Sequence, residues 1–180
     1  MLCNAHEPMK TQKLNVIKKE LSGLSVQQLA DICLRLAKYK KDNKELLNYL
    51  LYDASDPLAY SEQVKSYLEE EFKSLPRHYY QSSKVLRKIL RLMNRHAKYT
   101  ASKQVELELL LWFCSNFIKY ADTRTSHKPL QAIFIRQLDK IKSALPKLHE
   151  DLQFDYSREF ETLVDQSSAE VRWFSKSAYI

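Results

Sequence analysis

The amino-acid sequence predicts an all-α protein, and two observations support that prediction. The chain of 180 residues contains one glycine, Gly23, whereas average usage of about 7% would give about thirteen. Glycine supplies the positive φ angles of tight hairpins and phosphate-binding loops, so this chain cannot contain many β-hairpins, a P-loop or a GxGxxG turn. The second observation is the segment Val105–Ile118, whose apolar residues surround nearly the whole circumference of a helix.

Val105–Ile118 is predicted to be the central helix of a soluble domain. Its sequence, VELELLLWFCSNFI, contains only two charged residues, Glu106 and Glu108. A helix that is apolar almost all round is buried on most of its circumference. At about 1.5 Å per residue the segment is roughly 21 Å long, whereas the hydrocarbon core of a bilayer is roughly 30 Å thick. We therefore expect this helix inside a protein core, and we expect no membrane partner.

The first part of the chain is expected to form an extension and three helices. Residues 1–9 contain no apolar run typical of a signal peptide and are expected to be a flexible N-terminal extension. Gly23 is placed as a helix C-cap, and Ser25 and Gln28 have the spacing of a capping box. The apolar spacing predicts helices over residues 10–21, 25–41 and 44–53. Their expected core residues are Leu14, Ile17 and Leu21; Leu29, Ile32, Cys33 and Leu36; and Leu46, Leu47, Leu50 and Leu51.

Five further helices are expected after Asp56. Asp56-Pro57 has the form of a helix start because proline is well placed at the first helical position, and Pro76 ends that helix. A short turn, Thr100-Ala101-Ser102, leads into the central helix. The predicted helices cover residues 57–75, 82–98, 105–121, 129–145 and 147–164.

We expect these helices to form one compact bundle of seven or eight helices over residues 10–165, followed by a C-terminal tail over residues 166–180. The tail has no sustained period, and its large apolar residues either dock on the domain or form a recognition element for a partner. These residues are Trp173, Phe174, Tyr179 and Ile180.

An alternative architecture consists of two stacked three-helix units of the armadillo or HEAT kind, over residues 25–76 and 82–146. The tetrapeptides LAKY at 36–39 and HAKY at 96–99 each end a predicted helix, and a polar turn and a Leu-rich helix follow each. Two units are fewer than the roughly three that a stable solenoid usually needs. We therefore prefer the compact bundle.

Charge is segregated along the chain, whose formal net charge is +7. Residues 77–105 contain eight basic residues and no acid, whereas residues 45–76 and 148–165 each have a net charge of −5. On the helix predicted at 82–98, the arginines are spaced i, i+4, i+8 and share one face, which the lysines flank. Like charges at this spacing repel by a few tenths of a kcal/mol per pair, so we expect an anionic counterpart. The candidate binding residues are Lys84, Arg87, Lys88, Arg91, Arg95 and Lys98.

Three counterparts are considered for these six residues. The first is internal, an acidic face such as Glu69, Glu70 and Glu71 or Asp151, Asp155 and Glu159. The second is a nucleic-acid backbone, with Tyr79, Tyr80 and Tyr99 available to stack on bases. The third is an acidic protein partner, or no specific partner at all.

The sequence gives no indication of catalysis. It has no HExxH motif and no G-x-S-x-G elbow, and the acids at 151, 155 and 159 lack the Glu-x-x-His pairs of a carboxylate metal site. We therefore expect no catalytic residue, no cofactor and no metal. The three cysteines form no C-x-x-C pair, Cys33 and Cys114 are expected in the core, and a reducing cytoplasmic location is expected.

Four segments resemble an uncharacterised family of bacterial all-helical proteins. They are ICLRLAKYKKDNKELLNYLLYDA (32–54), KVLRKILRLMNRHAKY (84–99), VELELLLWFC (105–114) and LHEDLQFDY (148–156). The resemblance implies a compact bacterial cytoplasmic protein and transfers no activity. The sequence thus predicts a non-catalytic interaction module that uses charge-segregated helical faces to bind an acidic protein or a second copy. The alternative is nucleic-acid backbone binding through residues 84–98.

Overall fold

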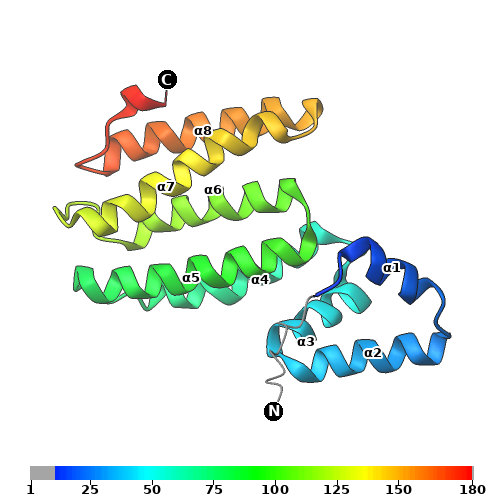
Figure 1. Ribbon diagram of the computed structural model, residues 1–180. Helices are drawn as coiled ribbons and strands as arrows, with labels where there is room; N and C mark the ends of the chain where they lie inside the picture. Colours follow the sequence, from blue (N-terminus) through cyan, green and yellow to red (C-terminus); the bar gives the residue numbers. More distant parts are fainter. Residues whose placement is uncertain (1–10, 180) are drawn as a thin grey trace, which may run out of the picture. The chain divides into compact units, whose positions relative to one another are not determined.

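The computed structural model describes residues 11–179, and the extension expected over residues 1–9 lies outside them. Helices make up 81% of the structure, and the described residues contain eight α-helices and no strand, which confirms the all-α prediction (Figure 1). None of the described helices combines the length and apolar composition needed to cross a membrane. The chain forms two compact units, one ending at Asn48 and the other beginning at Tyr49.

The first unit consists of three short helices: α1 (Leu14–Ser22), α2 (Val26–Tyr39) and α3 (Lys41–Asn48). The predicted capping box is present at the start of α2. The Gln28 backbone N–H donates to Ser25 Oγ at 3.3 Å, and the Ser25 N–H donates to Gln28 Oε1 at 2.9 Å. Gly23 caps α1 in a right-handed conformation, and its N–H donates to the Glu20 carbonyl at 3.1 Å. Helix α2 packs against α3.

The core that was expected in this first unit is not formed. Leu14 is 84% exposed and Leu36 is 55% exposed, and Cys33 is exposed rather than buried. None of the described residues up to Asn48 is fully buried. The physical reason is size, because three short helices offer too little apolar surface to enclose a core of their own. The helical period correctly groups the apolar residues on one face, but nothing in this unit covers that face completely.

The second unit contains a π-helical turn and five α-helices, of which four pack around α6. Helix α4 begins at Pro57 as predicted, and the Asp56 carboxylate accepts a hydrogen bond from the Ala59 N–H at 2.9 Å. Helix α6 packs against α4, α5, α7 and α8, whose axes run alongside it in Figure 1. The elements are η1 (Tyr49–Asp53), α4 (Pro57–Lys73), α5 (Tyr79–Thr100), α6 (Lys103–Tyr120), α7 (Lys128–Ala144), η2 (Leu145–Lys147), α8 (Glu150–Glu170) and η3 (Lys176–Ala178).

The prediction of a central helix at Val105–Ile118 is confirmed. Nine residues of α6 are buried, and Leu107, Phe113 and Phe117 have no exposed surface. Phe113 lies 5.4 Å from Phe72 of α4 between ring centroids, and Phe117 lies 4.8 Å from Phe134 of α7. Helix α6 therefore joins its neighbours through a continuous aromatic and aliphatic core.

The alternative of two three-helix repeats finds no support in this arrangement. The first proposed repeat, residues 25–76, would join α2 and α3 to α4. The boundary between the two compact units falls between α3 and α4, so these three helices do not form one unit. The expectation that residues 10–165 fold as a single domain stays a prediction.

The C-terminal residues dock on the second unit. Helix α8 continues to Glu170, so the segment expected to be aperiodic from residue 166 begins with more than a turn of helix. Val171 is 1% exposed, and Trp173 packs edge-on against Phe134 with ring centroids 6.0 Å apart. The Tyr179 hydroxyl donates to an Asp139 carboxylate oxygen at 2.9 Å. The sequence allowed the tail either to dock on the domain or to form a recognition element for a partner. Its described aromatic residues dock on the domain.

Candidate anion-binding face

The six predicted binding residues all lie on α5, which is longer at both ends than the sequence predicts. At about 100° of rotation per residue, they occupy about 100° of the helix circumference. We call them the α5 cationic face: Lys84, Arg87, Lys88, Arg91, Arg95 and Lys98. All are exposed except Arg95, which is half-buried. The opposite side of α5 carries Leu86, Ile89 and Met93, which are buried against the core.

An internal acidic counterpart is present at Lys88. Lys88 Nζ lies 2.7 Å from Glu71 Oε1 on α4, where both side chains remain partly exposed. Such exposed pairs contribute about 0–1 kcal/mol. Glu69 and Glu70 instead pair with Lys73 of their own helix, at 3.7 Å and 2.8 Å.

Arg87 and Arg91 remain exposed without an ion pair to any carboxylate in the part of the chain that the structure describes. The acids of α8 do not supply one, because α5 and α8 are not packed against each other. The internal explanation therefore accounts for Lys88 but leaves the centre of the face unneutralised. At the spacing of these two arginines, their repulsion costs a few tenths of a kcal/mol.

The tyrosines near the face have partners within the chain. The Tyr79 ring lies between two histidines, with centroids 4.6 Å from His78 and 4.4 Å from His127. Lys84 Nζ lies over the Tyr80 ring, 4.5 Å from its centroid. Tyr99 is half-buried. Base stacking on Tyr79 would require displacement of a histidine, so the phosphate backbone is a better match to this surface than the bases are.

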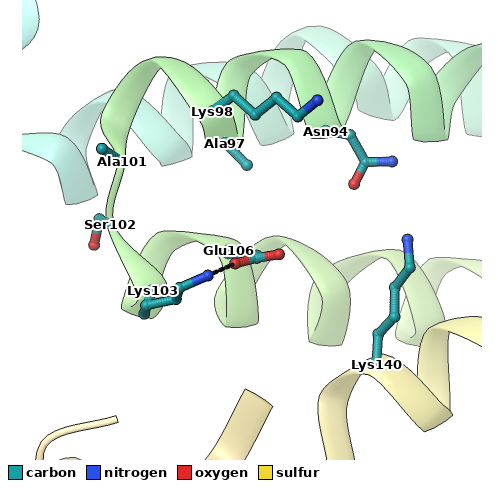
Figure 2. Close-up of a pocket in the computed structure, with 8 residues that line it drawn as sticks. All are labelled: Asn94, Ala97, Lys98, Ala101, Ser102, Lys103, Glu106 and Lys140. Carbon is teal, nitrogen blue, oxygen red and sulfur yellow. Dashed lines mark hydrogen bonds and ion pairs between the residues drawn. The ribbon is translucent and has the colours of Figure 1, made fainter. Parts of the chain in front are cut away.

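A pocket lies where the C-terminal end of this face meets α6 and α7 (Figure 2). Its volume is about 550 Å³. Figure 2 shows Lys140 extending from α7 toward the side of the pocket that carries Asn94. Lys103 Nζ donates to Glu106 Oε2 at 2.9 Å, whereas Lys98 and Lys140 have no ion pair among the described residues. We call this site the lysine pocket; it is lined by Asn94, Ala97, Lys98, Ala101, Ser102, Lys103, Glu106 and Lys140.

The backbone at the α5–α6 turn helps to shape this pocket. Ala101 adopts a left-handed conformation with φ of 50°, which reverses the chain between the two helices. Ser102 then caps α6, its Oγ accepting a hydrogen bond from the Val105 N–H at 3.3 Å. Lys103 is one of the eight basic residues in 77–105 but is not among the six binding residues that the sequence predicts. Lys140 is not among those six either, because only the packing of α7 against α5 and α6 brings that residue to the pocket.

On another side of α6, a polar network joins α4, α6 and α8. Lys65 Nζ lies 2.6 Å from Glu62 and 3.3 Å from Glu108, and the Tyr156 hydroxyl donates to Glu108 at 2.6 Å. Burial and the hydrogen bond to Glu108 raise the pKa of Tyr156 to about 12. Burial alone would lower the pKa of Lys65, but hydrogen bonds to the two glutamates outweigh it and raise that pKa. Glu108, one of the two charged residues in Val105–Ile118, is therefore a paired structural group.

The fold class is thus an all-α helical bundle with a docked C-terminus, and its candidate site is a set of basic side chains. No protein-family model, curated protein or solved structure matches the chain. This result is consistent with an uncharacterised family and gives no support for a bacterial origin.

Proposed function

We propose that this protein is a non-catalytic interaction module whose α5 cationic face binds an anionic macromolecule. The observation that carries the proposal is the exposure of Arg87 and Arg91 at the centre of the face, without a carboxylate partner among the described residues. Their mutual repulsion is relieved when an anion lies along the helix. Lys88, which pairs with Glu71, and the half-buried Arg95 lie on either side of Arg91 along the helix, and the Arg91 side chain stays exposed.

A nucleic-acid backbone is the alternative that the dimensions of the face favour. From Lys84 to Lys98 the face is about 21 Å long, at 1.5 Å per residue. One strand of B-form DNA presents a phosphate every 3.4 Å along its axis, so the face spans about six phosphates of one strand. Arginine suits this role because its planar guanidinium group binds phosphate oxygens in a bidentate manner.

An acidic protein partner is the other candidate, and we place both interactions in the cytoplasm. The support for a reducing compartment comes from the sequence, whose three cysteines are far apart and do not have the even number and short spacing of a disulfide framework. An acidic protein needs only complementary charge and does not require the even spacing of a phosphate backbone.

One titration separates these candidates. The full-length protein is mixed at 50 mM salt with a mixed-sequence DNA duplex, a single-stranded RNA and poly-glutamate, and binding is followed by fluorescence anisotropy. Backbone recognition predicts saturable binding of DNA or RNA that weakens steeply with salt. Binding of poly-glutamate with no binding of either nucleic acid would favour the acidic protein, and failure of all three probes would refute the proposed function.

A further inference from the structure

The lysine pocket differs from the α5 cationic face in shape and in the origin of its charges. Its basic groups come from three elements, since Lys98 belongs to α5, Lys103 to α6 and Lys140 to α7. The face is a convex stripe on one helix, whereas this site is a concavity of about 550 Å³, within the usual size range of small-ligand sites. A concave site that carries cations on several helices can contact a compact anion from more than one side, which a single helix face cannot do.

The donors in this pocket are available to a ligand. Lys98 and Lys140 lie on different helices and have no carboxylate partner among the residues that the structure describes. The Asn94 side-chain amide points into the space that Lys140 approaches, as Figure 2 shows, and it has no hydrogen-bond partner in the described part of the chain. Two ammonium groups and an amide thus offer N–H donors from opposite walls.

The charge of the lining indicates the charge of the ligand. Three lysines and one carboxylate, Glu106, give the pocket a formal net charge of +2. Glu106 Oε2 lies 2.9 Å from Lys103 Nζ, so this carboxylate forms an ion pair with Lys103 and not with Lys98 or Lys140. A phosphate monoester carries about −1.5 to −2 at pH 7, whereas a phosphodiester carries only one negative charge. The dianion is therefore the better electrostatic match.

We propose that the lysine pocket binds a phosphate monoester, with Lys98 and Lys140 contacting its terminal oxygens and Asn94 donating a further hydrogen bond. The monoester is either the terminal phosphate of a nucleic-acid strand or a small phosphorylated molecule, and the chemistry at the pocket is the same in both cases. The pocket shares Lys98 with the α5 cationic face, but Lys140 lies outside that face. The two proposals can therefore fail independently.

The test uses the full-length protein, with phenyl phosphate as the dianionic probe and diphenyl phosphate as the monoanionic one. Isothermal titration at pH 7.5 should show saturable binding of phenyl phosphate and binding of diphenyl phosphate at least about tenfold weaker. Lys140→Ala should weaken phenyl phosphate binding by at least about tenfold, the expected effect of losing one charge-assisted hydrogen bond. Lys128→Ala is the matched control, since Lys128 is also an exposed lysine on α7 but does not line the pocket.

Three outcomes would overturn the proposal: no saturable binding of phenyl phosphate, equal affinity for the two probes, or equal weakening by Lys128→Ala and Lys140→Ala.

A second experiment compares an oligonucleotide carrying a 5′-phosphate with the same oligonucleotide carrying a 5′-hydroxyl. Tighter binding of the phosphorylated strand, lost in Lys140→Ala, identifies the nucleic-acid terminus as the source. If phenyl phosphate binds as expected and the two strands bind equally, the site is supported and its ligand is a small phosphorylated molecule. Arg87→Ala should weaken macromolecule binding and leave the affinity for phenyl phosphate within about twofold.

Discussion

Substitution of Leu110 by aspartate tests the position of α6 at the centre of the second unit. Leu110 is 2% exposed. Truncation of a buried leucine to alanine costs about 2–5 kcal/mol, and an unpaired buried carboxylate adds a desolvation penalty of several kcal/mol. The sum is comparable with the total stability of a typical domain, about 5–15 kcal/mol. We therefore expect Leu110→Asp to be largely unfolded at 25 °C, as measured by far-ultraviolet circular dichroism during urea denaturation.

The matched control is Leu36→Asp on α2. The sequence predicts both leucines in the core, but Leu36 is 55% exposed in the structure. Its carboxylate would remain solvated, and we expect a loss of less than about 1 kcal/mol in the free energy of unfolding. A Leu110→Asp variant that retains wild-type stability would refute the placement of α6. A Leu36→Asp variant that unfolds as readily as Leu110→Asp would refute the exposure described for α2.

Three further predictions concern single residues. Tyr156→Phe removes the hydrogen bond to Glu108 and should cost about 1–3 kcal/mol in urea denaturation. Because the folded pKa of Tyr156 is raised to about 12, the wild type should lose stability as pH rises from 10 toward 12, where only the unfolded tyrosine ionises, and a pH series should show a smaller loss in the variant. Ala101→Gly should raise stability by about 0.5–1 kcal/mol in thermal unfolding, since glycine adopts a φ of 50° without the steric cost that alanine meets; a lower melting temperature would contradict this. A thiol reagent should label Cys33 in the folded protein and Cys114 only after unfolding, because burial also raises the pKa of the Cys114 thiol; peptide mapping that finds Cys114 labelled first would contradict the structure.

Local sequence predicts the elements of this protein better than it predicts what covers them. The capping box of Ser25 and Gln28 and the helix start at Pro57 depend on residues within one turn, so both could be located from the sequence. The composition of α6 predicts its place in the core, because the helix has almost no polar side to expose. The prediction that the apolar stripe of α2 is buried is wrong, because the helical period shows only which residues share a face, whereas burial requires another segment of the chain to cover that face.

The same distinction applies to the candidate site. The i, i+4, i+8 spacing of the arginines was sufficient to place the α5 cationic face on one side of a helix. The pairing of Lys88 with Glu71 and the approach of Lys140 to Asn94 required the packing of α4 and α7 against α5. No spacing in the sequence relates these positions, so the lysine pocket could be found only in the folded chain.

The dependence of nucleic-acid affinity on salt tests the proposed role of the α5 cationic face most directly. Association constants of the wild type and of Arg87→Ala/Arg91→Ala would be measured for a mixed-sequence DNA duplex between 50 and 200 mM salt. Each lost phosphate contact should reduce the slope of log K against log salt by about 0.9, so the double variant should lose about 1.8. The control Lys119→Ala/Lys128→Ala removes the same charge from exposed positions outside α5 and should leave the slope nearly unchanged. A slope that is equal in the wild type and the arginine variant, or reduced equally by the control, would contradict binding through this face.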